Sequence, residues 1–115
     1  MPTPNKAIAT VTQSDIVIPN GQHDSAEIDL TRVTLVGLFM PAAFDGTLLQ
    51  FKVAKALGGS YVDMLDGTTP MQVSVAAAGY VKLQPSDFVG ISAIKLSATT
   101  QQTADRTFTL VKRPI

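Results

Sequence analysis

The longest apolar tract of the chain, residues 33–54, contains two segments with the hydrophobic pattern of β-strands. Residues 33–39 are apolar except at Thr34 and Gly37, which is typical of a strand covered on both faces. Residues 47–54 alternate Leu, Phe and Val with more polar positions, which is typical of a strand with one solvated face. Between them, Pro41 lacks an amide donor and an Asp-Gly pair supplies a turn. We therefore predict two central strands, with the rest of the fold arranged around them.

The other apolar segments are short and are separated by turn residues such as Asn20-Gly21. We predict a single helical turn at residues 85–88, and further strands at residues 6–13, 15–18, 25–30, 61–65, 71–75, 79–83, 91–98 and 105–112. Three alanines at 76–78 are compatible with a short helix, but Val75 and Gly79 beside them favour a strand and a turn. Turns that recur roughly every eight to twelve residues favour an all-β antiparallel sandwich or barrel.

A chain of 115 residues is expected to form one domain, which buries roughly two thirds of its unfolded surface. Residues 1–5 contain two prolines and no periodic apolar signal, so we predict a flexible N-terminal arm. Residues 6–115 are then the β-sandwich domain. We find no tract near the ~20 apolar residues that a membrane span needs, and residues 7–12 are too short and too rich in threonine for a signal sequence. We expect a soluble protein without a membrane partner, synthesised in a cytoplasm.

The composition of the chain limits which kinds of molecule it could bind. Nine basic residues balance nine acidic ones, which argues against the phosphate-neutralising surface of a nucleic-acid-binding protein and leaves little repulsion between copies. Only 16% of the residues are charged while 45% are hydrophobic. This is little charge for a monomer that must cover its own surface, and it suggests that another chain covers part of it. The alternative is a small and unusually apolar soluble domain.

Residues that could support catalysis or metal binding are few. There is no cysteine, and the single histidine, His23, lies in a turn-rich stretch where an exposed loop residue is expected. The nearest carboxylate pairs, Glu27 with Asp29 and Asp63 with Asp66, are explained by a solvated strand face and by turn chemistry. Oxygen ligands for calcium could converge, with Asp24 as a further member, but no EF-hand-like spacing is present. We therefore expect no enzymatic activity and no cofactor.

Three segments are candidates for contacts with another chain. Residues 39–44 form an apolar connection where a solvated loop would be polar, so either a partner or the sandwich itself must bury it. Residues 97–104 form an uncharged loop that can hydrogen-bond to a neighbour at no cost of charge desolvation, unless it is an ordinary surface hairpin. With the N-terminal arm, the predicted contact residues are Pro2, Thr3, Pro4, Asn5, Lys6, Met40, Pro41, Phe44, Thr99, Thr100, Gln101 and Gln102.

Five segments in order carry a resemblance to a known group of proteins: SAEIDL (25–30), VGLFMPAAF (36–44), LQFKV (49–53), PSDF (85–88) and TADRTFTLV (103–111). They resemble small structural proteins of tailed bacteriophages, most closely the head decoration (cement) proteins. The resemblance implies a jelly-roll domain that binds the major capsid protein on the outside of the expanded head, as a dimer or trimer. Neck, tail and fibre positions in the virion are alternatives, because they are built from similar sandwiches.

A second interpretation is a carbohydrate-binding β-sandwich module. Tyr61 or Tyr80 would be the stacking platform, and Asp63 with Gln72 would supply hydrogen bonds. The absence of tryptophan weakens this interpretation, because carbohydrate binders usually present exposed aromatic platforms.

Overall fold

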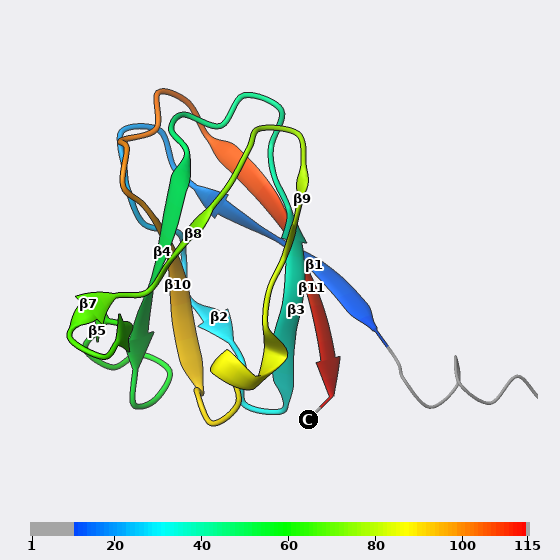
Figure 1. The fold of residues 1–115 in the computed structure, drawn as a ribbon, viewed down its shortest axis with the longest axis vertical. Coiled ribbons are helices and arrows are strands. Elements are labelled where there is room, and N and C mark those ends of the chain that lie inside the picture. Colours follow the sequence, from blue (N-terminus) through cyan, green and yellow to red (C-terminus); the bar gives the residue numbers. More distant parts are fainter. Residues whose placement is uncertain (1–10, 115) are drawn as a thin grey trace, which may run out of the picture.

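Residues 11–114, which the computed structural model describes, form two antiparallel β-sheets that pack face to face (Figure 1). The first sheet has the order β1 (Thr12–Ile18), β11 (Arg106–Pro114), β3 (Val33–Phe39) and β9 (Tyr80–Lys82). The second has the order β2 (Ile28–Asp29), β10 (Ala93–Ala98), β4 (Leu48–Ala54) and β5 (Val62–Asp63), with β8 (Gln72–Ser74) also paired to β4. The predicted all-β antiparallel sandwich is thus confirmed.

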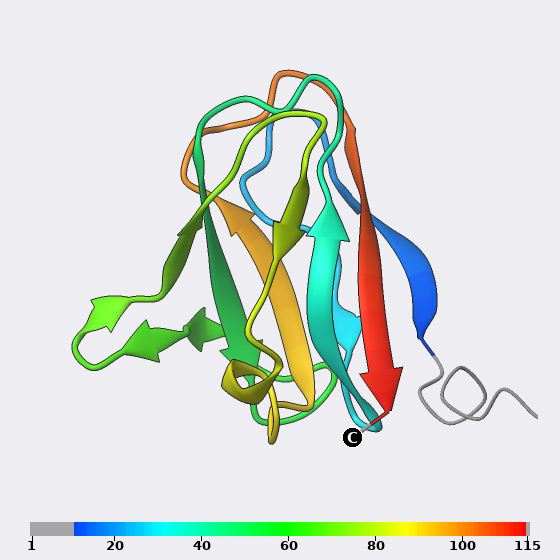
Figure 2. The ribbon, with the colours of Figure 1, turned by 45° about the vertical axis from the view of Figure 1, so that its right-hand side comes forward.

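A small ribbon stands apart from the two sheets. Strands β6 (Leu65–Asp66) and β7 (Thr69–Pro70) pair only with each other, across the predicted Asp66-Gly67 turn. Figure 2 shows this ribbon projecting from the side of the sandwich. It lies between β5 and β8, which pair with different parts of β4.

Most strands lie where the pattern predicts them, and the differences have local causes. The strand expected at residues 25–30 is reduced to β2 because the Ser25 hydroxyl accepts from the Leu96 amide, at 3.0 Å, where a strand carbonyl would do so. The separate strands expected at residues 6–13 and 15–18 are replaced by β1, and residues 6–10 lie outside the described part. The predicted helical turn is confirmed as the 3₁₀ turn η1 (Pro85–Asp87).

The core lies between the inner faces of the sheets. In β4 the predicted alternation is confirmed, with Leu49 and Phe51 buried and Gln50 only partly so. Phe51 meets Phe88 edge-on at 5.2 Å between ring centroids. Burying a phenylalanine side chain stabilises the fold by about 1.5–3 kcal/mol, so contacts of this kind hold the sheets together.

The expectation that residues 33–39 are covered on both faces holds only in part. Leu35 and Leu38 are buried on the inner face, but Phe39 is 45% exposed on the outer one. A register shift between β3 and β11 falls in this strand.

The connections gather at two ends of the sandwich (Figure 1). One end, called the upper end here, carries the loops at residues 19–24, 40–47, 75–79 and 99–105. The lower end carries the connections at residues 30–32, 55–61 and 83–92. The predicted contact segments of residues 40–44 and 99–102 therefore come together at the upper end.

Candidate interaction surfaces

The apolar connection at the upper end is buried by its own chain. Phe44 is 7% exposed and Met40 is 6% exposed. The Phe44 ring meets Phe108 of β11 edge-on, at 5.7 Å between centroids. The expectation that a partner covers Met40 and Phe44 is therefore wrong, and the alternative is correct, because Phe44 closes the end of the sandwich. Pro41 is half-buried, and its carbonyl accepts a hydrogen bond from the Ala78 amide.

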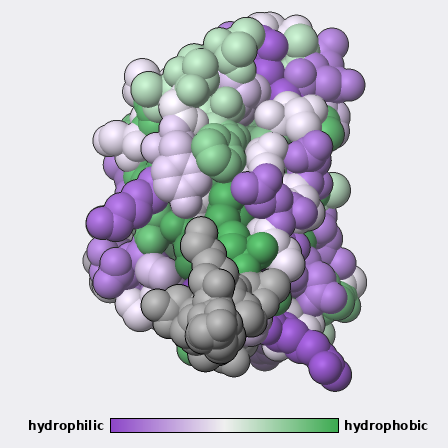
Figure 3. Space-filling view, turned by 90° about the vertical axis from the view of Figure 1, so that its right-hand side faces the viewer, coloured by the Kyte–Doolittle hydropathy of each residue, from purple (hydrophilic) through white to green (hydrophobic). Residues whose placement is uncertain are grey.

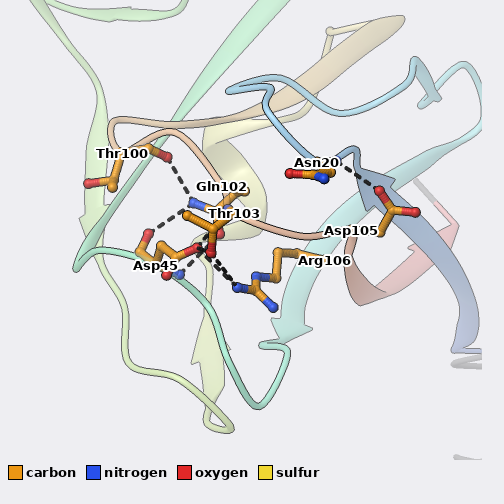
Figure 4. Close-up of polar contacts among 7 residues, drawn as sticks. All are labelled: Asn20, Asp45, Thr100, Gln102, Thr103, Asp105 and Arg106. Atoms are coloured by element: carbon orange, nitrogen blue, oxygen red, sulfur yellow. Dashed lines mark hydrogen bonds and ion pairs between the residues drawn. The ribbon is translucent and has the colours of Figure 1, made fainter.

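Gln102 is the second correction, because its side chain is 1% exposed. Its amide nitrogen donates to the carbonyl oxygens of Asp45 (2.9 Å) and Thr100 (2.8 Å), and its amide oxygen accepts from the Asp45 amide (3.0 Å). Figure 4 shows it between the two loops that it joins. A side chain used in this way fixes loops of its own chain and has no group left for a neighbour.

Asp45 holds the same loops together through its carboxylate. The Thr103 amide and hydroxyl each donate to Oδ2 at 2.9 Å, and Arg106 donates at 3.0 Å (Figure 4). The hydrogen bond from the Thr103 amide, followed by those from Arg106 and the Thr103 hydroxyl, lowers the pKa of Asp45. At the upper end, Asp45, Gln102, Thr103 and Arg106 thus form a network of hydrogen bonds within the chain, and the Phe44 ring packs beneath it against Phe108.

The other predicted contact residues differ in their placement. Thr99, Thr100 and Gln101 are exposed, although the Gln101 side chain donates to the Gly21 carbonyl at 2.7 Å. The arm residues Pro2, Thr3, Pro4, Asn5 and Lys6 lie outside the described residues.

Exposed apolar surface lies instead at the lower end. A groove of about 650 Å³, called the lower groove here, runs between the β4–β5 connection and the loop before β10. Val62 on its rim is 63% exposed, and Leu57, Leu65 and Val89 are other exposed apolar side chains of this region and the nearby ribbon. Its lining includes Val53, Ala54, Ala56, Val62, Gly90 and Ile91. The sequence predicts a strand at residues 61–65 but gives no sign of this surface, which forms because β5 is only two residues long and leaves Val62 exposed.

The outer face of the first sheet carries a smaller apolar patch. The rings of Phe39 and Tyr80 lie 4.7 Å apart, and each residue is nearly half exposed. Tyr80 lies across Gly37, where any Cβ atom would overlap its hydroxyl. Figure 3 shows apolar side chains along the middle of this face, with polar ones on both sides.

The outer face of the second sheet is polar and charged. Lys52 lies opposite Lys95 in the β4–β10 pair, and Asp24 accepts from Lys52 (3.0 Å) and from Ser97 (2.7 Å). Partial burial raises the pKa of Asp24, but the hydrogen bonds from Ser97 and Lys52 outweigh it, so the net pKa is lowered. A shallow groove of about 530 Å³, called the Asp24 groove here, is lined by Asp24, Lys52 and Ser97 together with His23, Gln50, Asp63 and Thr99.

Neither of the tyrosines proposed as carbohydrate-binding platforms lines the Asp24 groove. Tyr80 lies on the first sheet, whereas Asp63 and Gln72 belong to the second. Lys95 lies over the Tyr61 ring at 4.5 Å, so a sugar cannot stack on that face of the ring. Burial, followed by a hydrogen bond to Glu27, raises the pKa of Tyr61.

The carboxylates of Glu27 and Asp29, considered for catalysis, accept hydrogen bonds from neighbouring segments of their own chain. Glu27 accepts from the Gly58 amide at 2.7 Å, and Asp29 accepts from the Thr31 amide at 2.8 Å. His23 contacts the Ala98 carbonyl through Nδ1. Residues 11–114 contain no group of three or more histidines and carboxylates that could hold a metal ion. The same residues contain no helix of the length and hydrophobicity that would cross a bilayer.

Comparisons with known protein families, with curated proteins and with solved structures gave no match for this chain.

Proposed function

We propose that this protein is a non-enzymatic structural protein of a tailed-bacteriophage virion, which decorates the exterior of the head by binding the major capsid protein. The observation that carries the proposal is the lower groove with its exposed rim residues, above all Val62. Apolar side chains that gather on a surface mark sites of protein–protein contact. The groove replaces Met40 and Phe44 as the principal contact surface, because both side chains are buried within the chain.

The strand order supports the jelly-roll interpretation that the resemblance implies. With β5, β6 and β7 counted as an insertion, eight strands remain, in the orders β1-β11-β3-β9 and β2-β10-β4-β8. The first sheet then holds the first, eighth, third and sixth strands, and the second holds the others in the order second, seventh, fourth, fifth. This order supports the jelly-roll interpretation, because jelly rolls pack two such four-stranded sheets and are used by viral capsid domains.

The chemistry of the lower groove indicates the kind of partner surface. Lys55 is the one charged residue in its lining, and the side chains beside it are apolar or small. The chain has no net charge, which permits dense packing of many copies on one shell. A standard interface buries about 800 Å² per partner, and a contact of that size at every capsid position would stabilise a shell against internal pressure.

Co-sedimentation with phage heads tests the proposal. Purified protein is mixed with expanded, undecorated heads of the phage that encodes it, and with unexpanded proheads. We expect saturable binding to expanded heads, with a fixed number of copies per shell. The absence of binding to both forms would refute a head-decorating role.

A pair of variants tests whether the lower groove makes the contact. Val62→Asp places a charge on the rim and is expected to weaken binding at least about tenfold, since a desolvated charge in an apolar contact is costly. Thr68→Asp, on the exposed turn of the ribbon, is the control and should bind as the parent does. Both variants should keep the parent's melting temperature, because both sites are on the surface. Equal binding by the two variants would move the contact away from the groove.

The Asp24 groove favours a second candidate, a saccharide-binding module of the virion. It offers hydrogen-bond donors and acceptors on a sheet face, with Lys52, Asp24 and Asp63 close together. Polyols are bound by such convergent polar groups. A glycan array, followed by titration of any hit against Asp63→Ala, tests this candidate. A flat array response would remove it.

A further inference from the structure

Strand β1 has one free edge. It pairs with β11 along its whole length of seven residues, and no other segment of residues 11–114 pairs with its opposite side. Figure 2 shows β1 at the margin of the first sheet, beyond β11. The other edge strands are short: β2 and β5 have two residues, and β8 and β9 have three. The free edge of β1 is therefore the longest open row of backbone donors and acceptors in the described part of the chain.

The sequence of β1 does little to protect this edge. Edge strands are usually blunted by proline, lysine or a bulge, and residues 12–18 contain neither residue. The pairing of β1 with β11 runs without a register shift. Asp15 is the only charged side chain of the strand, and it accepts a hydrogen bond from Thr109 within the sheet, at 2.9 Å. An edge of this kind is competent to receive another strand.

We propose that the partner is β1 of a second copy, joined in antiparallel fashion about a two-fold axis. The chain has nine basic and nine acidic residues, so two copies repel each other little. A two-fold axis along the sheet normal keeps inner side chains beside inner ones and outer beside outer. The axis must therefore pass through a single residue position of β1. Residues that lie opposite each other across the axis then have numbers that add up to the same even value.

The side chains of β1 select one such register. An axis at Asp15 would place two carboxylates directly opposite each other, and an axis at Ile16 would place Asp15 opposite Val17. An axis at Ser14 avoids both, because Asp15 then lies opposite Gln13 of the second copy. It also places Val11, which is 52% exposed, opposite the partially buried Val17. The register centred on Ser14 thus avoids facing carboxylates, places Asp15 beside a polar Gln13, and pairs Val11 with Val17.

The dimer would have one continuous sheet, formed by the first sheets of the two copies. Their outer faces then lie side by side, so two Phe39–Tyr80 patches face the same way. The dimer itself does not depend on the proposed virion function, since its test needs no capsid.

Cysteine crosslinking tests the register, because the chain has no native cysteine. Three full-length variants, Gln13→Cys, Ser14→Cys and Asp15→Cys, are oxidised and run on non-reducing gels. In the proposed register only residue 14 meets its own copy across the axis, within the distance that a disulfide requires. We expect Ser14→Cys to form covalent dimers at least about tenfold faster than the other two. Fastest crosslinking by Asp15→Cys, or equal rates for all three, would overturn the register.

A charge series at Gln13 tests the same contact without a covalent bond. In the proposed register Gln13→Lys faces Asp15 of the second copy and strengthens the dimer, whereas Gln13→Asp weakens it. Two such pairs per dimer give a change of about fivefold in each direction. Sedimentation equilibrium reports the dissociation constant, with the dimer at twice the 12.2 kDa chain mass. Thr107→Lys, one strand inward on the outer face, is the control and should leave the constant unchanged.

The outcome also separates this proposal from the proposed function. A parent protein that stays at 12.2 kDa at all concentrations and forms no crosslinks would overturn the dimer, whether or not it binds heads. Protection of the β1 amides only on addition of heads would assign the edge to the capsid protein and would also overturn it. Crosslinked dimers that fail to bind heads would support the β1 contact and refute the decorating role.

Discussion

Substitution of Gln102 decides between a structural and a partner-binding role for the upper loops. Its side chain is almost fully buried and makes three hydrogen bonds, two to Asp45 and one to Thr100. Gln102→Leu keeps a similar volume but removes all three. Each such bond contributes about 1 kcal/mol net, so the loss should be about 3 kcal/mol. A domain of this size loses roughly 10 °C in melting temperature for that change.

The matched control is the neighbouring residue. Gln101 is exposed and makes one hydrogen bond, to the Gly21 carbonyl at 2.7 Å. Gln101→Leu should therefore cost about 1 kcal/mol or less. Urea unfolding, followed by far-UV circular dichroism, gives the free energy of unfolding of both variants. The folded fraction should stay high in both, because domains of this kind have about 5–15 kcal/mol to lose.

A third variant changes how stability depends on pH, an effect that a general loss of packing would not produce. Gln102→Glu keeps an acceptor for the Asp45 amide but loses the two donors while the carboxylate is charged. Protonation restores one donor, so this variant should gain stability relative to the parent as the pH falls. Equal stabilities of the Gln101→Leu and Gln102→Leu variants, with head binding lost only in the latter, would refute the structural role.

Two further predictions concern a close contact and a charge. Gly37→Ala should cost about 1–3 kcal/mol in thermal denaturation, because the new Cβ overlaps Tyr80, and adding Tyr80→Ala should recover most of this loss. If the two substitutions change the free energy of unfolding additively, the contact between residue 37 and Tyr80 would be contradicted. At Asp45, hydrogen bonds to the charged form lower the pKa from 3.8, so the folded state binds fewer protons and the contribution to stability is lost as the pH falls below about 4. Asp45→Asn should therefore be less stable than the parent at neutral pH, with a difference that narrows in acid; a difference constant with pH in urea unfolding would contradict this.

The strands were predictable from the sequence because their signals are local. The period of two in β4 and the continuous apolar run of β3 each depend on neighbouring residues, and both strands lie within one residue of their expected bounds. The helical turn η1 was predictable from Pro85 in the same way. Where a side chain replaced the strand ladder, as Ser25 does at Leu96, the pattern predicted more strand than exists.

The candidate site was less predictable, because what covers a residue depends on distant parts of the chain. Residues 39–44 were recognised as needing cover, but the cover is Phe108, which no local pattern connects to Phe44. Gln102 reads as a surface residue, and it is buried because its partners come from two loops that only the fold brings together. Val62 lies in the strand predicted at residues 61–65, but the sequence does not show that β5 is only two residues long and leaves Val62 on the rim of the lower groove.

The distribution of polar bonds over the molecule indicates which surfaces are available to partners. At the upper end, the side chains of Asp45 and Gln102 form hydrogen bonds within the chain. A partner that bound there would have to displace contacts that already stabilise the loops. At the lower groove exposed apolar side chains such as Val62 can gain contacts on association, and along the free edge of β1 unpaired backbone groups can gain hydrogen bonds, without displacing contacts inside the chain. The two surfaces lie on different elements, β1 of the first sheet and β5, which carries Val62, of the second, so one copy can use both at once. A dimer joined through β1 would therefore carry two lower grooves, and attachment at both would bind a repeating lattice far more tightly than one groove could.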